Sequence, residues 1–435
     1  MGKGLRSHAP DFSILADNPN FARLWVGQLL SQIGDQALLI ATLQLVNDLS
    51  DSVTALLIPA LALALPQVLF GLVGGVMADR WNRQTTMIVS DVLRGLVVFS
   101  LLAIQFTGRL WILYLGVALL AVVGVFFYPA RNALLPNIVP VAELWSANAL
   151  IQGSTMLALV VGPALAGVAI SLWGVGFAFV FDAVTFFLSA TAIASLDLGP
   201  HQAMVADGSP HGVRRNLSEG LRYIAAHTLL KQTLALVAAA TLGVAAIVLL
   251  AVRHLDEALG VSAAGYGLTL TVLGAGSLVG GVIASRLSRR VRPHLLVSGM
   301  LLIAGAAIVA FALAPAYWVV LVSVALLGMS VVTARGSLDT ITQLLAPDAV
   351  RGRVQSAVNL IIGASTALAE GLSALLGDLL GVRTVFLGAG ALTAGAGAAA
   401  WWILRRFDAE AESARGESLL QETISPQAST GSKST

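Results

Sequence analysis

The chain has 435 residues, of which 57% are hydrophobic and 11% are charged, with a formal net charge of +2. Soluble domains carry about a quarter charged residues, so this composition excludes a water-soluble protein. The chain has no cysteine, which excludes disulfides and thiolate metal sites, and its six histidines lie in loops or near the ends of apolar segments. We therefore expect neither a metal site nor a cofactor.

Apolar runs of the length that crosses a bilayer, about 20 residues in a helix, recur along the chain. Because lipid offers no partner for backbone amides, each run is predicted to be helical. We place twelve spans at 22–46, 53–78, 85–106, 111–132, 143–171, 174–196, 217–252, 262–284, 295–314, 316–338, 354–377 and 382–404. The seventh run is overlong, and residues 218–231 are predicted to form an amphipathic lead-in to it.

The two ends of the chain are polar. Residues 1–20 precede an apolar run of spanning length, which excludes a cleaved signal peptide. Residues 408–435 are rich in Ser, Thr, Gln, Gly and Glu and are predicted to form a disordered tail without helix. Lys and Arg concentrate on the side of both termini, whereas the opposite side holds Arg109, Arg253 and Arg383. This bias predicts a multi-pass protein of the plasma (inner) membrane with both termini in the cytoplasm.

A charged motif occurs twice, once in each half of the chain. GGVMADRWNR at 74–83 and GGVIASRLSR at 280–289 share the pattern G-G-V-x-A-x-R-x-x-R, and residues 129–153 align with 333–363 at a similar offset. The second six helices therefore repeat the first six. We predict an all-α membrane fold with an N-terminal bundle at 21–196, a linker at 197–216 and a C-terminal bundle at 217–407. Two parallel six-helix pseudo-repeats are the pattern of the major facilitator architecture.

At these residues the chain resembles the major facilitator superfamily over 20–407. The segment Gly75-x-x-x-Asp79-Arg80-x-x-Arg83 resembles the family's loop signature, with Asn82 and Gln84 as departures. GPALAG at 162–167 resembles the Gly-Pro motif of drug/proton antiporters, although its upstream glycine spacing is not kept. LWVGQLLSQIGDQALLIATL, SDVLRGLVV and ARNALLPNIV…SANAL resemble the branch that contains macrolide efflux proteins and enterobactin exporters.

The first copy of the charged motif has a mechanical interpretation. Its glycines permit close helix packing, and Asp79, at the end of the second helix, could face the positive N-terminus of another helix. The resemblance implies that this is the eleventh helix, which begins near Val354. The resemblance thus implies a cytoplasmic latch between the halves, made by Gly75, Asp79, Arg80 and Arg83. The alternative is a positive-inside turn with an incidental acid.

The fifth helix contains a predicted hinge. Gly162, Pro163 and Gly167 form it, because proline weakens helix hydrogen bonding. Tight packing is the alternative interpretation of these three residues.

Ionisable side chains within spans are costly and mark function by default. In the first helix, Gln28, Gln32 and Asp35 follow a 4-3 spacing and share one stripe. The resemblance implies that this helix lines a central cavity. Burial favours the neutral form of a carboxylate, so Asp35 and Glu370, in the eleventh helix, are candidates for proton coupling. A structural role in helix contacts is the alternative for both acids.

Other polar residues within spans have simpler interpretations. Asp91 and Arg94 are three residues apart and are predicted to pair, and Asp182 is predicted to hydrogen-bond between helices. Candidates for a cytoplasmic gate lie at the ends of the fourth, fifth, tenth and eleventh helices: Arg131, Asn148, Arg335, Asp339 and Asn359. For the two arginines, anchoring at the membrane surface is the alternative.

The predicted function is secondary active efflux of a lipophilic small molecule (drug, macrolide-like or siderophore-like) in exchange for protons. A proton-coupled importer is the alternative, because the residues do not fix direction. A multispan enzyme would need a convergent nucleophile, base or metal set, and the short loops, poor in histidine, do not provide one. The chain has no G-x-x-x-x-G-K-[ST] motif for direct ATP drive. Expected partners are substrate, protons and the bilayer, but no nucleic acid, and we expect a monomer.

Overall fold

The computed structural model describes residues 12–63, 65–66, 70, 81–197, 219, 221–287, 291–345 and 348–424. These residues are almost entirely helical and contain no β-strand. The helices are α1 (Ile14–Asp17), α2 (Pro19–Leu49), η1 (Val53–Leu56), α4 (Arg83–Ser100), η2 (Leu101–Ala103), α5 (Ile104–Thr107), α6 (Leu110–Ile138), η3 (Val141–Glu143), α7 (Leu144–Trp173), α8 (Val175–Ala194), α10 (Thr228–Leu259), α11 (Ala263–Leu287), α12 (Pro293–Ala312), α13 (Tyr317–Leu345), α14 (Asp348–Leu380) and α15 (Val382–Ile424).

The predicted membrane fold is confirmed. Among the described residues, eleven helices are long and apolar enough to cross a bilayer. The remaining predicted span, 53–78, begins as the apolar helix Val53–Leu63, and most of the rest of it lies outside the described residues. The linker at 197–216 also lies outside them, apart from Asp197.

Local sequence signals set where several helices begin. Pro19 occupies the first turn of α2, where its missing N–H costs nothing, and the Asn18 side chain accepts a hydrogen bond from the Phe21 amide at 2.9 Å. Asn82 caps α4 in the same way by accepting from the Thr85 amide at 3.0 Å. The Asn82 that departs from the loop signature therefore ends the loop and begins the third transmembrane helix.

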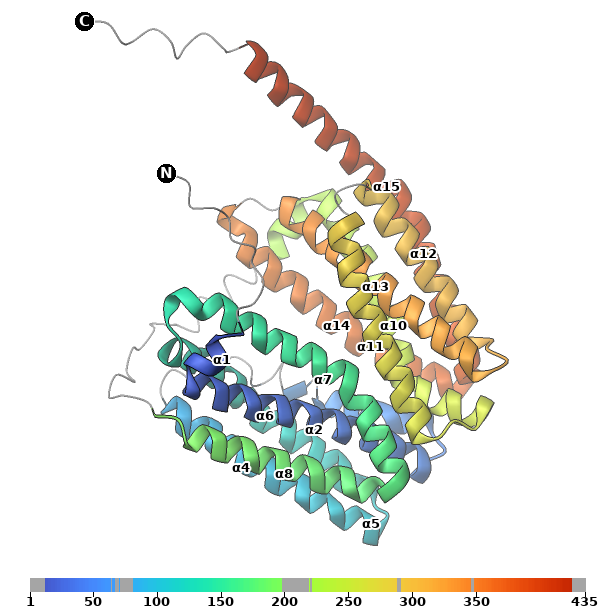
Figure 1. The fold of residues 1–435 in the computed structure, drawn as a ribbon. Coiled ribbons are helices and arrows are strands. Elements are labelled where there is room, and N and C mark those ends of the chain that lie inside the picture. Colours follow the sequence, from blue (N-terminus) through green and yellow to red (C-terminus); the bar gives the residue numbers. More distant parts are fainter. Residues whose placement is uncertain are drawn as a thin grey trace, which may run out of the picture.

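The last helix differs from the prediction. No helix was expected beyond residue 407, yet α15 continues to Ile424. The extension is rich in Ala and Glu and contains a Leu pair, residues that favour helix, and these preferences outweigh the polarity that indicated disorder. At 1.5 Å per residue, a helix of 43 residues is about 65 Å long, so it extends well past a hydrocarbon core of about 30 Å. Figure 1 shows this end projecting from the bundle.

The seventh span begins later than predicted. Residues 221–226 form a separate helical segment, His227 interrupts it, and α10 begins at Thr228. The lead-in is therefore a distinct element before the membrane helix, and α10 extends to Leu259.

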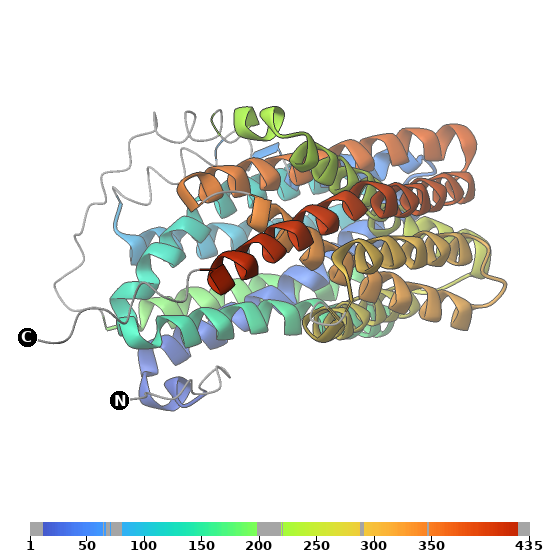
Figure 2. The same ribbon diagram turned by 90° about the horizontal axis from the view of Figure 1, so that it is seen from above.

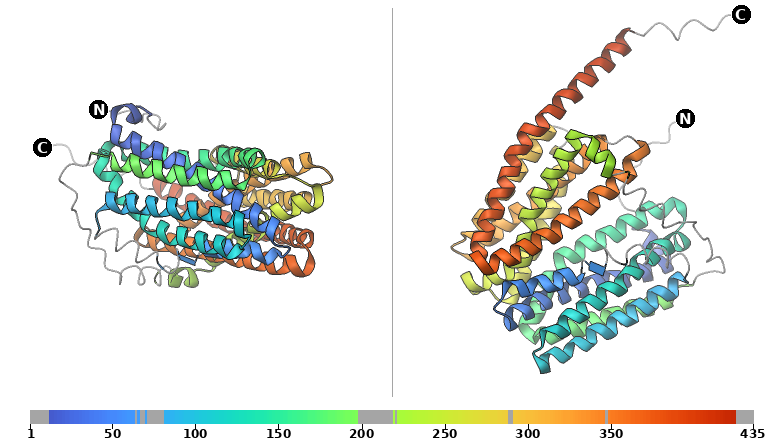
Figure 3. Two further views of the ribbon diagram at one scale, coloured as in Figure 1. Left: turned by 90° about the horizontal axis from the view of Figure 1, so that it is seen from below. Right: turned by 180° about the vertical axis from the view of Figure 1, so that it is seen from behind.

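The spans form two bundles. The helices before residue 197 gather in one bundle and α10–α15 in a second, as the opposite views in Figures 1 and 3 show. Within each bundle the helices run side by side along a common direction (Figure 2). The two bundles diverge toward the side on which α2 begins and α15 ends, which we call the terminal side, and they meet at the opposite end, which we call the closed end.

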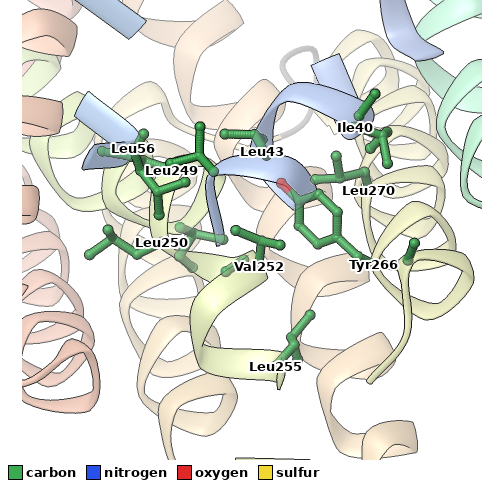
Figure 4. Close-up of a cluster of buried hydrophobic side chains, with 14 of the residues drawn as sticks. Ile40, Leu43, Leu56, Leu249, Leu250, Val252, Leu255, Tyr266 and Leu270 are labelled. Carbon is green, nitrogen blue, oxygen red and sulfur yellow. The ribbon is translucent and has the colours of Figure 1, made fainter. Parts of the chain in front are cut away.

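An apolar cluster joins the bundles toward the closed end. Buried side chains from both halves form one continuous core there. Figure 4 shows the residues that meet: Ile40, Leu43 and Leu56 from the first bundle, Leu249, Leu250, Val252 and Leu255 from α10, and Tyr266 and Leu270 from α11. Close packing of this kind excludes water between the halves.

Helices α7 and α11 touch along a seam of small residues. A Cβ atom added to Gly267 would lie 3.1 Å from the Cα atom of Gly167, and one added to Gly274 would lie 3.3 Å from the Cα atom of Val160. The Ala264 amide also donates to the Ser171 hydroxyl at 3.1 Å. Glycine permits this approach of two helix backbones, so the seam requires small residues on both sides.

Candidate transport site

A cavity of about 630 Å³ lies between the two bundles. Of the described residues, three charged side chains line it: Asp35 from α2, Arg94 from α4 and Glu370 from α14. The other lining residues are mainly apolar, and Leu43, Leu56 and Leu249 also belong to the cluster of Figure 4. The structure thus brings the two predicted proton-coupling acids, which come from different halves, to one cavity.

The polar stripe of α2 is divided between the cavity and the bundle interior. Asp35 lines the cavity. Gln28 is buried and donates to the Ser189 hydroxyl of α8 at 3.3 Å, and Gln32 donates to the Gln28 carbonyl at 3.1 Å. Neither glutamine lines the cavity, so a direct contact between them and cargo stays a prediction. Both make hydrogen bonds within the first bundle.

The predicted Asp91–Arg94 pair is confirmed. The Arg94 Nη2 atom donates to Asp91 Oδ1, and both side chains are buried. The guanidinium lies 4.2 Å from the ring centroid of Phe127 and 4.5 Å from that of Phe186, where cation–π attraction holds it. Arg94 nevertheless lines the cavity, so the ion pair with Asp91 also forms part of the cavity wall.

Removing Asp91 alone is expected to destabilise the protein. The Asp91→Leu variant leaves the Arg94 guanidinium buried without its counter-ion, which costs about 3–5 kcal/mol. We expect a lower melting temperature and less monodisperse protein in size-exclusion chromatography after heating. The double variant Asp91→Leu/Arg94→Met removes both charges and should regain most of the loss. A single variant as stable as the wild type would contradict the assignment.

Glu370 stands at the boundary of two spaces. It lines the central cavity and a second cavity of about 320 Å³ within the second bundle, and Val248 and Thr366 are also shared. Arg335 lines the second cavity, and its Nε atom donates to both oxygens of Asp339 at 3.0 Å. The two predicted gate residues of α13 therefore pair with each other, one helical turn apart.

The other gate candidates make local contacts. Arg131 stacks over the Tyr128 ring at 5.3 Å and donates to the Asn132 side chain at 3.2 and 3.3 Å. Asn148 donates to the Leu144 carbonyl of its own helix at 2.8 Å, and Asn359 accepts from Gln355 at 3.3 Å. Within the described part of the chain, no hydrogen bond links these side chains across the bundles. Gating by them stays a prediction.

The predicted latch falls mostly outside the described residues, which exclude Gly75, Asp79 and Arg80. Arg83 is described, and its Nη1 atom donates to the Ala133 carbonyl near the end of α6 at 3.0 Å. The latch therefore stays a prediction.

The predicted hinge residues lie in continuous helix α7. A Cβ atom on Gly162 would lie 2.7 Å from the Cβ atom of Gln36, and Gly167 belongs to the seam with α11. Close packing, the alternative interpretation, is therefore present at both glycines. Bending at Pro163 stays a prediction.

The closed end carries polar contacts between the halves that sequence reasoning missed. Asp378, near the end of α14, accepts hydrogen bonds from the Val53 amide at 2.6 Å, the Thr54 amide at 3.0 Å and the Ser52 hydroxyl at 2.9 Å, and from the Thr54 hydroxyl. A carboxylate from one bundle thus caps the first turn of the other bundle's second span. The only available signal was the Ser-x-Thr sequence that opens this span.

Two further contacts support this cap. Arg253 of α10 donates to the carbonyls of Ser50 and Asp51 at 3.0 and 2.7 Å. Asn47 of α2 donates to Asp256 of α10 at 2.9 Å. We call Asp378, Arg253 and the Asn47–Asp256 pair, with the chain at 50–54 that they hold, the polar clamp.

The whole chain matches one protein family. The sequence profile described as transmembrane secretion effector, a major facilitator profile, matches residues 11–429. The chain belongs to this family of the major facilitator superfamily. It is therefore a membrane transporter of small molecules and not an enzyme.

Named relatives of this major facilitator protein include efflux pumps. It is 23% identical to macrolide efflux protein A of Streptococcus pyogenes over 86% of this chain and 93% of that one. It is 28% identical to the multidrug efflux pump Tap of Mycobacterium tuberculosis over 82% and 87% of the two chains. An uncharacterised major facilitator transporter of Bacillus subtilis, YfiS, is 31% identical over 39% of this chain and 40% of that one.

Solved structures support the fold of this major facilitator chain. A bacterial homologue of the human lysosomal transporter Spinster, in an inward-facing and unoccupied conformation, superposes with a TM-score of 0.70 at 14% identity, over 91% of this chain and 98% of that one. At that identity the likeness establishes the architecture alone.

Proposed function

We propose that this transporter exports a lipophilic small molecule across the plasma membrane in exchange for protons, by alternating access. One observation carries the proposal. A single cavity between the halves combines a largely apolar wall with one carboxylate from each half, Asp35 and Glu370. Such a space suits an amphipathic molecule and acids that bind protons, so both substrates of an antiporter have a place in it.

The charges of the cavity favour neutral, cationic or zwitterionic cargo. Among the described residues, Arg94 is the one cationic side chain that lines the cavity, and Asp91 already neutralises it. No ion pair among the described residues involves Asp35 or Glu370. A protonated amine on the cargo would compete with protons for these carboxylates, which is a direct way to couple the two movements.

The arrangement of the halves supports alternating access. The polar clamp and the apolar cluster of Figure 4 join the bundles at the closed end, whereas the bundles diverge toward the terminal side. With the termini in the cytoplasm, as the positive-inside bias predicts, the cavity opens inward in this conformation. Cargo would then enter from the cytoplasm, which is the loading state of an exporter.

The function is tested by expression in a drug-sensitive bacterial strain. Resistance to erythromycin, tetracycline and ethidium is measured with and without the gene, and siderophore secretion is measured in parallel. We expect raised resistance to at least one lipophilic compound, and dissipation of the proton gradient should abolish it. Inverted vesicles should accumulate the same compound only under an imposed pH gradient. Unchanged resistance, or accumulation that does not depend on the gradient, would contradict the proposal.

A further inference from the structure

A third acid of the first bundle lies behind the cavity wall. Asp182 of α8 is 0% exposed and does not line the cavity. Its Oδ1 atom accepts from the Thr185 hydroxyl at 3.4 Å, and its Oδ2 atom has no hydrogen-bond partner. An ionised carboxylate with an unpartnered buried oxygen is costly, so a neutral, protonated Asp182 fits this environment.

Asp182 lies directly against the helix that carries Asp35. A Cβ atom added to Gly34 of α2 would lie 3.2 Å from the Cα atom of Asp182 and would also meet the Asp182 Oδ1 atom. Gly34 immediately precedes Asp35 in the sequence. The glycine therefore makes room for the carboxyl group of α8 beside the functional acid of α2.

The local charges do not balance if all the acids are ionised. The charged groups that act on Asp182 are Asp35 of α2 and Asp91 and Arg94 of α4. Helix α7, which also packs on α8, contributes none, because no charged residue occurs in Leu144–Trp173. Arg94 is the one cation of this set, and it pairs with Asp91. Asp35 and Asp182 are thus two buried acids on adjoining helices without a counter-ion of their own, and the negative charge of one disfavours ionisation of the other.

We propose that Asp182 is a second proton-binding residue of the transport reaction and exchanges its proton with Asp35. When Asp35 is ionised, Asp182 holds the proton. No hydrogen bond joins the two carboxyl groups in this conformation, so the exchange requires a side-chain rotation that brings them within hydrogen-bond reach. The O–H bond of Asp182 then breaks, the proton joins a carboxylate oxygen of Asp35, and the charge of the pair does not change. Asp35 lines the cavity and Asp182 does not, so Asp182 gains or loses its proton through Asp35. This inference rests on the proposed proton coupling.

Infrared spectroscopy of the purified full-length protein in lipid films tests the protonation directly. The wild type at neutral pH should show the carbonyl stretching band of a protonated carboxyl group, and this band should shift in deuterium oxide because Asp182 exchanges its proton through Asp35. Asp182→Asn should remove this band, since an amide keeps the shape and the contact with Thr185. The control is Asp48→Asn, an acid that bonds to Gln44 within α2, and it should leave the band unchanged. A band that persists in Asp182→Asn would overturn the proposal.

Transport then separates a functional role from a structural one. In proteoliposomes with ethidium as probe, Asp182→Asn should lose dependence on the pH gradient while downhill counterflow continues. Full pH dependence in Asp182→Asn, together with its loss in Asp35→Asn, would overturn this inference and leave the antiport proposal intact. Full pH dependence in both variants would instead overturn the antiport proposal. Should Asp182→Asn fail to fold, Asp182→Glu moves the carboxyl group by one methylene, and an unshifted infrared band would overturn the assignment.

Discussion

Asp35→Asn is expected to bind cargo and to lose all pH-driven transport, down to the rate of protein-free vesicles. Asparagine has nearly the shape of a protonated aspartic acid, but it cannot release a proton. Asp35 lines the cavity from α2, so the change alters an acid that, on the proposed mechanism, meets both cargo and water. Counterflow, which needs no proton movement, should continue, although cationic cargo should bind more weakly because the Asp35 carboxylate is gone.

The measurement is uptake of erythromycin or ethidium into proteoliposomes under an imposed pH gradient, with binding followed separately by fluorescence. Glu370→Gln provides the comparison from the other half, and we expect it to weaken pH dependence as well. Asp48→Asn, an exposed acid of α2 bonded to Gln44, is the matched control and should transport normally. Unchanged gradient-driven uptake in Asp35→Asn would remove this residue from the coupling mechanism.

Asp378→Ala is expected to open the closed end. The substitution removes the acceptor of the hydrogen bonds from the Val53 and Thr54 amides and from the hydroxyls of residues 52 and 54. The carboxylate is exposed and therefore screened by solvent, so we assign the change only the value of a lost helix cap, about 1 kcal/mol. That corresponds to a roughly fivefold shift in the population of the two conformations.

The absence of cysteine makes the measurement simple, because introduced cysteines are the only labelling sites. Spin labels at Phe106→Cys and Trp318→Cys, which are 88% and 68% exposed near the closed end of each bundle, report the distance between the halves. Asp378→Ala should increase the fraction of long distances, whereas Asp48→Asn should not. Identical distance distributions in the variant and the wild type would show that Asp378 does not hold the bundles together.

The architecture was predictable because few backbone conformations satisfy all their hydrogen bonds within a lipid bilayer. Apolar runs of spanning length must be helices, and the repeated charged motif revealed the two halves. The ends of the spans were less predictable. The extension of α15 to Ile424 depends on helix propensity outside the membrane, where polarity alone does not distinguish a solvated helix from a disordered tail.

The site was predictable residue by residue but not as an arrangement. Asp35, Glu370 and the Asp91–Arg94 pair stand out because charge within a span needs a reason. These residues converge on one cavity because of how the two bundles pack. The intervals between residues in the sequence do not predict that packing. Arg94 shows the limit: its pairing follows from the three-residue interval, whereas its exposure to the cavity between Phe127 and Phe186 does not.

The polar clamp was missed for a related reason. Asp378 and the chain at 50–54 are separated by more than three hundred residues, and each lies where polar side chains are ordinary. The clamp also has a counterpart in the predicted latch. There, an acid at the end of the second span would cap the eleventh; here, an acid near the end of the eleventh caps the second. Each contact would hold one conformation, on opposite sides of the membrane.

The glycine seam between α7 and α11 is a position where a substitution should favour the other conformation, in which the closed end is open. Because Gly267 lies so near Gly167, a leucine at position 267 has no room while these backbones touch. Such a protein should spend most of its time with the closed end open, and an antibody fragment raised against it would select that form. A side chain of four carbons would thereby act as a wedge that makes the cargo-releasing state accessible to structure determination.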